Sequence, residues 1–416
     1  MATKASTAPK PQWAFRSRLR RSAFGWRGSK PAIARIEEAL AEIRAAARHD
    51  PAHAAEGAVL FLEKLSPAVR EVDSSSGALG SAANRAVEAL VPIIAAASVA
   101  DAVRAKWLER LFEAIQEDDP PYIELLGDHW GELCVMPAVA SRWADDLTPT
   151  LRRVLEERKR GTFGWFPGSG ICYSALFKAG RHDELLALLE LNPHPIWQDL
   201  VWGGRVLAAR GCVDEAIAYV KARAGINTPQ GALARFAEQA LLRAERRAEA
   251  YRDYAVAANR AVSRLATYRA IAKKYPEIAP DRLLGDLIAS TPGEEGKWFA
   301  TARSLGRLDL AIALAWRSPC DPKTLTRAAR AHLAAEPAFA AEAALAALHW
   351  MSRGYGYELT ALDAREAHRH AVEAGRRIGQ EERVALEVER LLASEGAGPS
   401  WLRRVLGVNE PRRAAR

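Results

Sequence analysis

The feature of this sequence that most limits its fold is a segment that recurs about every 31 residues in the C-terminal half. A small-residue turn is followed by an acidic, apolar helix start at Gly180–Glu190, Gly211–Lys221 and Gly306–Trp316, and Glu245–Tyr254 is a version without the glycine. This spacing is the length of one helical hairpin, and repeated hairpins stack into elongated arrays. We therefore predict an all-α fold, with an α-solenoid of antiparallel helical hairpins of the tetratricopeptide or HEAT type over residues 171–393.

The phase of the repeat predicts where the two helices of each hairpin meet. We expect turns near Gly180, Gly211, Glu245, Tyr275, Gly306 and Glu336. Helix starts are predicted by a capping residue followed by proline, because the side-chain oxygen accepts a hydrogen bond from an orphan amide and proline at the first helical position loses none. Such pairs occur at Asp50-Pro51, Ser66-Pro67, Thr148-Pro149, Thr228-Pro229, Thr291-Pro292 and Asp321-Pro322.

The rest of the chain divides by composition into further segments. Residues 1–12 offer almost nothing to bury and are predicted to be a disordered tail. Residues 13–160 predict an N-terminal α-helical domain of about six helices joined by short loops. Residues 161–170 are rich in glycine and are predicted to be the junction between this domain and the array. Residues 394–416 are a predicted basic C-terminal tail.

No motif of a catalytic, cofactor or metal site is visible in the sequence. The four cysteines stand far apart without a Cys-x-x-Cys pair, which argues against zinc and a disulfide framework and favours a reducing compartment. Gly293–Lys297 lacks the spacing of a phosphate-binding loop. We predict no catalytic residue, no cofactor and no metal ligand. No stretch approaches about 18 uninterrupted apolar residues, so we also predict a cytoplasmic protein without a membrane partner.

The positive charge is concentrated at the two ends of the chain. Residues 1–36 hold nine Lys or Arg and no acid, and a second basic cluster lies in residues 403–416. The N-terminal arm has three interpretations: it packs as a short helix on the body with its arginines outward, it binds the phosphates of nucleic acid, or it is a transit peptide. The candidate phosphate contacts are Arg16, Arg18, Arg20, Arg21, Arg27, Arg403 and Arg404.

A second candidate surface lies within the array. Residues 260, 264 and 268 are four apart and would share one helix face, on which an Arg, Asn and Tyr set suits acidic peptides or phosphate. The candidate partner-binding residues are Asn259, Arg260, Arg264, Tyr268, Arg269 and Lys273. The alternative is a solvated outer face without a partner.

The segment Gly354–Tyr357 places two tyrosines on a turn that contains two glycines. Large aromatic side chains of this kind either form an exposed recognition edge or lock one hairpin onto the next. We favour the second interpretation.

Four segments resemble a family of uncharacterised bacterial helical-repeat proteins: Gln12–Gly28, Thr291–Phe299, Ser318–Ala329 and Gly354–Thr360. The resemblance extends roughly from Gln12 to Val408. It implies a bacterial, cytoplasmic setting, which argues against a transit peptide. It implies no activity, cofactor or catalytic residue.

These observations predict a non-enzymatic interaction scaffold that binds a protein or peptide partner in a helical-repeat groove. The alternative is a nucleic-acid-binding protein that uses the basic arm and an Arg/Lys-rich helix face. An enzyme whose site is assembled in space from distant residues stays open as a third hypothesis. The sequence indicates no oligomeric state.

Overall fold

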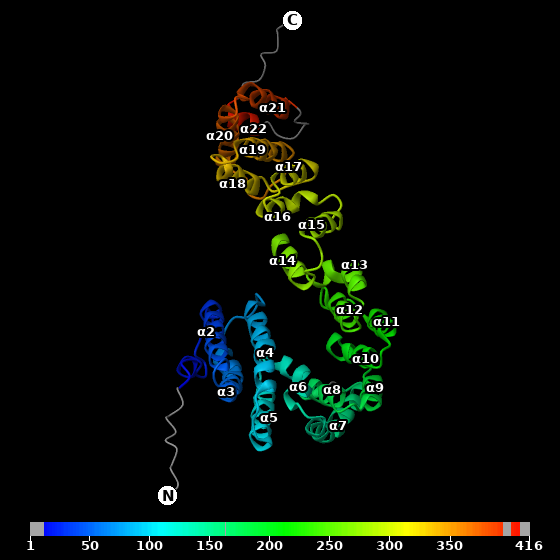
Figure 1. Ribbon diagram of the computed structural model, residues 1–416. Coiled ribbons are helices and arrows are strands. Elements are labelled where there is room, and N and C mark those ends of the chain that lie inside the picture. Colours follow the sequence, from blue (N-terminus) through cyan, green and yellow to red (C-terminus); the bar gives the residue numbers. More distant parts are fainter. Residues whose placement is uncertain (1–11, 163, 394–400, 408–416) are drawn as a thin grey trace. The chain divides into compact units, whose positions relative to one another are not determined.

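The structure is a computed structural model that describes residues 12–162, 164–393 and 401–407. All regular elements in these ranges are helices, which confirms the all-α prediction for them (Figure 1). The predicted tail at residues 1–12 lies outside the described residues except for Gln12. None of the described helices is both long enough and apolar enough to cross a membrane.

The chain divides into two compact units, Met1–Phe236 (unit 1) and Ala237–Arg416 (unit 2). The division falls inside helix α12 (Ala232–Arg243). Each unit has its own cluster of buried apolar side chains, one around Phe61 and Trp130 and the other around Trp298 and Phe299. We describe each unit by itself.

Unit 1 is built from helices that follow one another closely. Its elements are α1 (Phe15–Arg18), α2 (Ser29–Ala47), α3 (Pro51–Val69), α4 (Ala78–Ala96), α5 (Asp101–Gln116), the 3-10 segment η1 (Glu124–His129), α6 (Trp130–Cys134), α7 (Pro137–Lys159), α8 (Ser169–Lys178), α9 (His182–Leu191), α10 (Trp197–Ala209) and α11 (Val213–Arg223). Most of these helices pack on the next helix and on the next but one, as α2 does on α3 and α4.

Unit 2 follows the same pattern beyond α12. Its elements are α13 (Arg247–Ala258), α14 (Arg264–Lys274), α15 (Pro280–Ala289), the 3-10 segment η2 (Glu295–Trp298), α16 (Phe299–Ser304), α17 (Leu308–Arg317), α18 (Pro322–His332), α19 (Pro337–Ser352), α20 (Ala361–Arg377), α21 (Glu381–Ala393) and α22 (Trp401–Leu406). From α17 onward each helix packs on the next but one, so that α18 contacts both α19 and α20. Helix α22 lies within the predicted C-terminal tail, so that part of the tail is helical. It packs on the body of unit 2, since Leu402 is 1% exposed.

The predicted turns lie between consecutive helices, and four of them share one backbone geometry. Gly180, Gly211, Glu245 and Gly306 all have left-handed φ angles, between +60° and +85°. In each turn the amide after this residue donates to the carbonyl five residues earlier: Arg181 to Leu176, Cys212 to Leu207, Arg246 to Leu241 and Arg307 to Ala302. This is the Schellman helix ending, in which the left-handed residue satisfies an otherwise orphan carbonyl. How the hairpins superimpose as a solenoid stays a prediction.

Proline pairs mark helix starts in some places and not in others. Asp50 and Asp321 cap α3 and α18, accepting hydrogen bonds from His53 N and Thr324 N at 2.9 Å each, as predicted. The predicted starts at Ser66-Pro67 and Thr148-Pro149 are wrong, because α3 and α7 continue through both prolines. Ser66 and Thr148 are buried among apolar neighbours of their helices. Packing of the helix on both sides of the proline offsets its cost of about 3 kcal/mol.

For the two remaining pairs, Thr228-Pro229 and Thr291-Pro292, the next helical segment begins three residues after the proline. These prolines therefore lie in the preceding loops. Neither is the first residue of a helix.

The glycine-rich segment 161–170 lies within unit 1, where it connects α7 to α8 and includes the first two residues of α8; the two helices pack on each other. One of its glycines serves a close approach of two chain segments. A Cβ on Gly170 would lie 3.3 Å from Asp128 Oδ1 and 3.5 Å from the carbonyl carbon of Gly127. The boundary between the compact units lies further along the chain, at residues 236 and 237.

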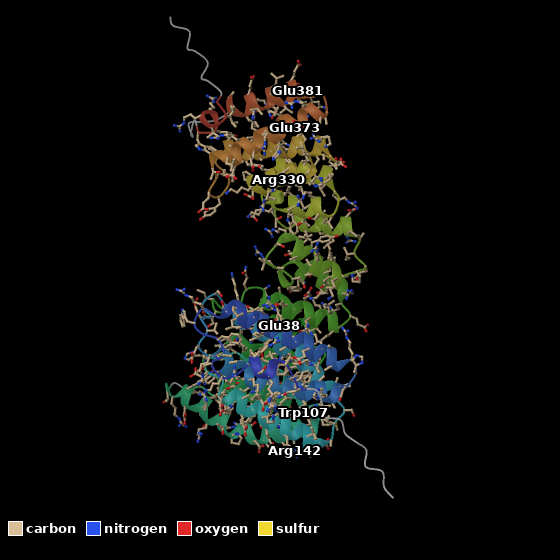
Figure 2. All side chains as sticks on the ribbon, turned by 90° about the vertical axis from the view of Figure 1, so that its left-hand side faces the viewer. Glu38, Trp107, Arg142, Arg330, Glu373 and Glu381 are labelled. Atoms are coloured by element: carbon tan, nitrogen blue, oxygen red, sulfur yellow. The ribbon has the colours of Figure 1, made fainter. Side chains whose placement is uncertain are left out.

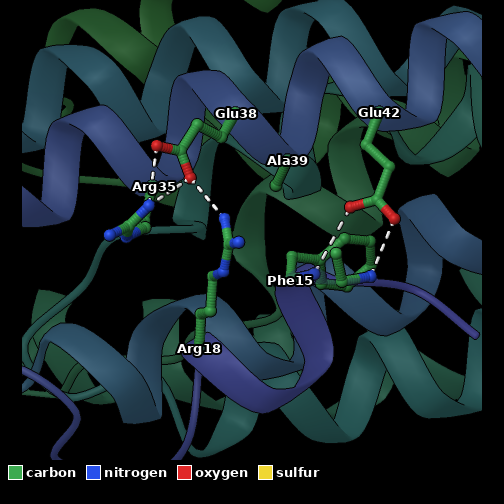
Figure 3. A pocket seen from close by; sticks show the side chains of 7 residues that line it. Phe15, Arg18, Arg35, Glu38, Ala39 and Glu42 are labelled. Carbon is green, nitrogen blue, oxygen red and sulfur yellow. Dashed lines mark hydrogen bonds and ion pairs between the residues drawn. The ribbon is translucent and has the colours of Figure 1, made fainter.

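The N-terminal segment from Trp13 onward packs against α2 and α3, which confirms the first interpretation of the arm for these residues. Phe15 is 2% exposed and meets Phe61 of α3 edge to face at 5.7 Å. The carboxylate of Glu42 accepts hydrogen bonds from the backbone amides of Ala14 (2.7 Å) and Phe15 (3.3 Å). A pocket of about 330 Å³ lies beside these contacts, and Figure 3 shows its polar groups paired with one another.

Candidate functional site

A groove of about 350 Å³ lies between α18 and α20 of unit 2. Residues three and four apart share one face of a helix, and the lining follows this rule on both walls. The α18 wall is predominantly cationic, whereas the α20 wall combines two acids with a histidine. The lining residues are Lys323, Thr326, Arg327 and Arg330 on α18, and Asp363, Glu366 and His370 on α20.

Local sequence explains why these side chains face the groove. On α18 the apolar residues Leu325, Ala328 and Ala329 are 0% exposed and form the packed face of the helix. The charged residues between them are therefore left on the open face. On α20 the start is fixed by a capping box, because Thr360 Oγ1 accepts from Asp363 N at 3.4 Å while Asp363 Oδ2 accepts from Thr360 N at 2.8 Å.

The cations of the α18 wall differ in how firmly they are held. Lys323 Nζ donates to the carbonyl of Glu358 at 2.8 Å and lies 3.8 Å from Asp363 Oδ2. Arg327 donates to groups of its own helix, the carbonyl of Lys323 at 3.1 Å among them. Arg330 is exposed and has no hydrogen bond or ion pair to any residue that the structure describes (Figure 2). Its guanidinium donors are available to a ligand.

The acids of the opposite wall are partly committed to α20 itself. Burial raises the pKa of Asp363, but the hydrogen bonds from Thr360 and the charge of Lys323 outweigh burial and hold that pKa below its usual value. Glu366 lies 3.9 Å from Arg369 on the same helix. Asp363 is therefore an anion at neutral pH and closes the Lys323 end of the groove.

His370 is the unusual member of the lining. Its side chain is 5% exposed, and its Nε2 has no hydrogen-bond partner among the described residues. Burial lowers the pKa of His370, and the charges of Arg369 and Arg330 lower it further against the opposing effect of Glu366. A buried polar atom without a partner costs about 1–3 kcal/mol. His370 lines the groove, so a ligand there would lie against a histidine whose hydrogen-bonding capacity is not used up by the described residues.

Two exposed apolar side chains adjoin, in sequence, residues at the Lys323 end of the groove: Tyr357 precedes Glu358, whose carbonyl accepts from Lys323, and Leu362 precedes Asp363. Tyr357 is 80% exposed in the loop before α20, and Leu362 is 64% exposed in the first turn of α20. We call these two residues the rim. Tyr355 lies differently, with its ring edge to face with Trp350 at 5.2 Å. This contact is local to the end of α19, so locking of one hairpin onto the next stays a prediction, and Tyr357 faces solvent.

The predicted partner-binding face does not exist as one helix face. α13 ends at Ala258 and α14 begins at Arg264, so Asn259 and Arg260 lie in the connection between them. The cause is Ser263, whose hydroxyl accepts a hydrogen bond from Ala266 N at 3.1 Å and starts a new helix.

The side chains of that predicted face have separate surroundings. Asn259 donates to Glu238 Oε1 at 2.6 Å, and Arg264 donates to Glu294 Oε2 at 3.1 Å. Tyr268 is 6% exposed and belongs to the core of unit 2. The members that stay exposed are Arg260, Arg269 and Lys273.

Asn259 belongs to a buried network centred on Glu238, which is 2% exposed. The carboxylate of Glu238 also accepts hydrogen bonds from Lys274 Nζ at 2.7 Å and from the Tyr275 hydroxyl at 2.8 Å. Burial, followed by Glu238 itself, raises the pKa of Tyr275. Removing one partner of this paired carboxylate would leave a buried charge uncompensated, which is strongly destabilising. Because its oxygens are already paired, the network offers nothing to a ligand.

The predicted phosphate contacts are distributed over both units. In unit 1, Arg18 donates to Glu38 at 2.7 Å (Figure 3), whereas Arg16, Arg20, Arg21 and Arg27 are exposed. In unit 2, Arg403 donates to the carbonyl of Leu392 at 2.8 Å, and Arg404 is exposed. The side chains of Arg16, Arg20, Arg21 and Arg27 are thus exposed to solvent, whereas Arg403 is hydrogen-bonded to the backbone of unit 2.

Unit 1 contains a group of carboxyls that sequence reasoning missed. Burial raises the pKa values of Glu124, Asp128 and Asp199, and the like charges of Asp118, Asp128 and Asp199 raise that of Glu124 further. Asp199 has a structural role, since it accepts hydrogen bonds from Asn192 Nδ2 at 3.0 Å and Ile196 N at 3.1 Å at the start of α10. Within the described ranges, no three His, Cys, Asp or Glu side chains are grouped so that they could hold a metal ion.

No known protein family, curated protein or solved structure matches the chain. The class of the protein therefore follows from its structure alone. It is a helical protein, as far as the described residues go, with a charged groove between two helices of unit 2.

Proposed function

We propose that the protein is a non-enzymatic interaction scaffold of successive helical hairpins, and that the α18–α20 groove binds an acidic segment of a protein partner. The observation that carries this proposal is the cationic wall of α18 facing a buried histidine without a hydrogen-bond partner. A carboxylate placed between Arg330 and His370 would accept charge-assisted hydrogen bonds from the guanidinium, which are stronger than neutral ones.

Packing supports the scaffold part of the proposal. Helices that contact the next and the next but one, such as α18 with α19 and α20, are the arrangement from which helical hairpins build an array. Such arrays bind partners along their surfaces. They need no catalytic group to do so.

The acids of the groove favour a peptide over a nucleic acid as occupant. Asp363 and Glu366 stand opposite the cations. The closely spaced phosphates of a nucleic-acid backbone would place negative charge beside these carboxylates, and the like charges would repel each other. An acidic side chain of a peptide carries its charge at one point and can be placed at Arg330, away from Asp363.

The test is a binding titration of the full-length protein with fluorescein-labelled acidic nonapeptides, followed by fluorescence anisotropy. The double variant Arg327→Gln/Arg330→Gln is expected to raise the dissociation constant at least about tenfold, which corresponds to about 1.4 kcal/mol. Arg282→Gln is the matched control, because Arg282 is an exposed arginine of unit 2 on α15. Equal affinities of the double variant and the wild type would contradict the proposal, as would the absence of binding to any acidic peptide.

The N-terminal arm supports a second candidate function, the binding of nucleic acid. Arg16, Arg20 and Arg21 are exposed, and Trp26 of the same segment is 69% exposed, so phosphate contacts and base stacking are both available. Mobility shifts with short DNA and RNA at low salt are expected to weaken steeply with added salt and to be lost in Arg16→Ala/Arg20→Ala/Arg21→Ala. Arg35→Ala, which removes an arginine paired with Glu38, is the control. No shift at low salt would exclude this function.

A further inference from the structure

We infer that the peptide bound in the α18–α20 groove carries an apolar side chain about three residues from its acidic side chain, seated on the rim formed by Tyr357 and Leu362. This inference rests on the proposed function and adds a recognition element at the other end of the same groove. It predicts a sequence pattern in the partner as well as its charge.

The rim and Arg330 lie at opposite ends of the groove. Lys323 bonds to the carbonyl of Glu358, the residue after Tyr357, at 2.8 Å. Leu362 directly precedes Asp363, which lies 3.8 Å from Lys323. Both rim residues are thereby placed at the Lys323 end.

Arg330 and His370 mark the other end. Arg330 lies seven residues after Lys323 on α18, and His370 lies seven residues after Asp363 on α20. Lys323 is paired with Asp363 at one end, and Arg330 and His370, each seven residues further along its helix, line the same groove, so the two helices run in the same direction along it. At about 1.5 Å per residue of helix, the two ends are about 10 Å apart.

This length sets the spacing in the peptide. An extended chain covers about 3.3 Å per residue, so about three residues join a side chain at Arg330 to one on the rim. The occupant at the rim is apolar because Tyr357 and Leu362 are large, apolar and mostly exposed, and burying such surface favours binding. The occupant at Arg330 is acidic by charge complementarity.

The rim and the groove lining are adjacent on helix α20. Residues four apart are neighbours on a helix, so Leu362 lies beside Glu366 of the groove lining. The rim surface is thus continuous with the α20 wall. A single short peptide can contact both without leaving the groove.

The experiment uses the full-length protein and labelled Ser/Ala nonapeptides that contain one Glu and one Leu. The two residues are placed one to five positions apart, in both orders, and dissociation constants are measured by fluorescence anisotropy. We expect the tightest binding at a separation of three in one of the two orders. Moving the Leu by two positions is expected to weaken binding about fivefold to tenfold.

Variants of the rim separate this inference from the proposed function. Tyr357→Ser/Leu362→Ser is expected to weaken binding of the best Glu/Leu peptide about tenfold and to leave a peptide with Glu alone unchanged. Leu386→Ser is the matched control, because Leu386 is 66% exposed on α21. Leu362→Ser alone, checked by circular dichroism, serves if the double variant fails to fold.

Each result has a definite reading. If the separation or the rim variants make no difference while Arg327→Gln/Arg330→Gln weakens binding, the inference is wrong and the proposed function stands. If no peptide binds and a short oligonucleotide binds in the groove instead, with loss in Arg327→Gln/Arg330→Gln, both are wrong. A best separation of three that depends on the rim supports both.

Discussion

At the scale of single residues, Glu245 occupies the position that glycine occupies in three equivalent turns. Its φ of +60° is left-handed, and its side chain is exposed. Such a conformation costs a residue with a side chain about 1–2 kcal/mol, whereas glycine adopts it freely. The shared turn is therefore a property of the backbone. Its amino acid can vary at a price in stability.

This geometry predicts opposite effects of two substitutions in unit 2. Gly306→Ala is expected to lower the free energy of unfolding by about 1–2 kcal/mol. Glu245→Gly is expected to raise it by up to about 1 kcal/mol, because the added flexibility of the unfolded chain offsets part of the gain. Urea unfolding followed by circular dichroism measures both.

Gly285→Ala is the control for this pair. Gly285 lies inside α15 with nothing within 4 Å of an added Cβ, and its φ is not left-handed. Alanine is expected to stabilise that helix by about 1 kcal/mol. A loss of stability in Glu245→Gly would refute the interpretation of the turn.

At the scale of elements, the sequence predicted helix class and turn positions well because both depend on local rules. Glycine position and hydrophobic period located the turns at Gly180, Gly211 and Gly306. Caps predicted the starts of α3 and α18. The same rules failed at Pro67 and Pro149, because packing against other helices, which local sequence does not reveal, keeps α3 and α7 helical through these prolines.

The candidate site was missed for a related reason. Its two walls, Lys323–Arg330 and Asp363–His370, are separated by α19 in the chain and meet only through the fold. A signal was nevertheless present, since residues 323, 327 and 330 share a face on a helix whose start at Asp321-Pro322 was predicted. The face predicted instead, around residues 260–268, failed because the cap at Ser263 was overlooked.

At the scale of the whole molecule, the two units differ in which buried or partly buried ionisable groups have shifted pKa values. In unit 2, burial lowers the pKa values of His349, His368 and His370. The stability that these neutral histidines contribute is fully present above about pH 6.5, the pKa of histidine in an unfolded chain, and it is lost as the pH falls below that value. Unit 1 instead contains carboxyls with raised pKa values, Asp128 and Asp199 among them. Their contribution is present at acid pH and is lost as the pH rises through the raised values.

Lowering the pH from about 7 to about 4 is therefore expected to destabilise unit 2, as its histidines are protonated on unfolding, and to favour unit 1, as its carboxyls take up protons. Hydrogen exchange with mass spectrometry on the full-length protein resolves the two units, after correction for the pH dependence of intrinsic exchange. Protection should fall in α19 and α20 relative to α8 and α10. Asp128→Asn should reduce the gain in unit 1. Equal changes in both units would contradict the assignment of these pKa shifts to the stability of each unit.

The packing of α17 to α22 on their near neighbours in the chain also bears on how unit 2 folds. Its main tertiary contacts join segments that are close in sequence, as α18 does with α19 and α20. Loop closure before such contacts costs little entropy, and domains of low contact order fold quickly. Helices at one end of such a row can open without the rest. The two walls of the α18–α20 groove both pack closely on α19, whereas α14 to α16 are packed more sparsely, so the groove is expected to keep its structure when α14 to α16 open.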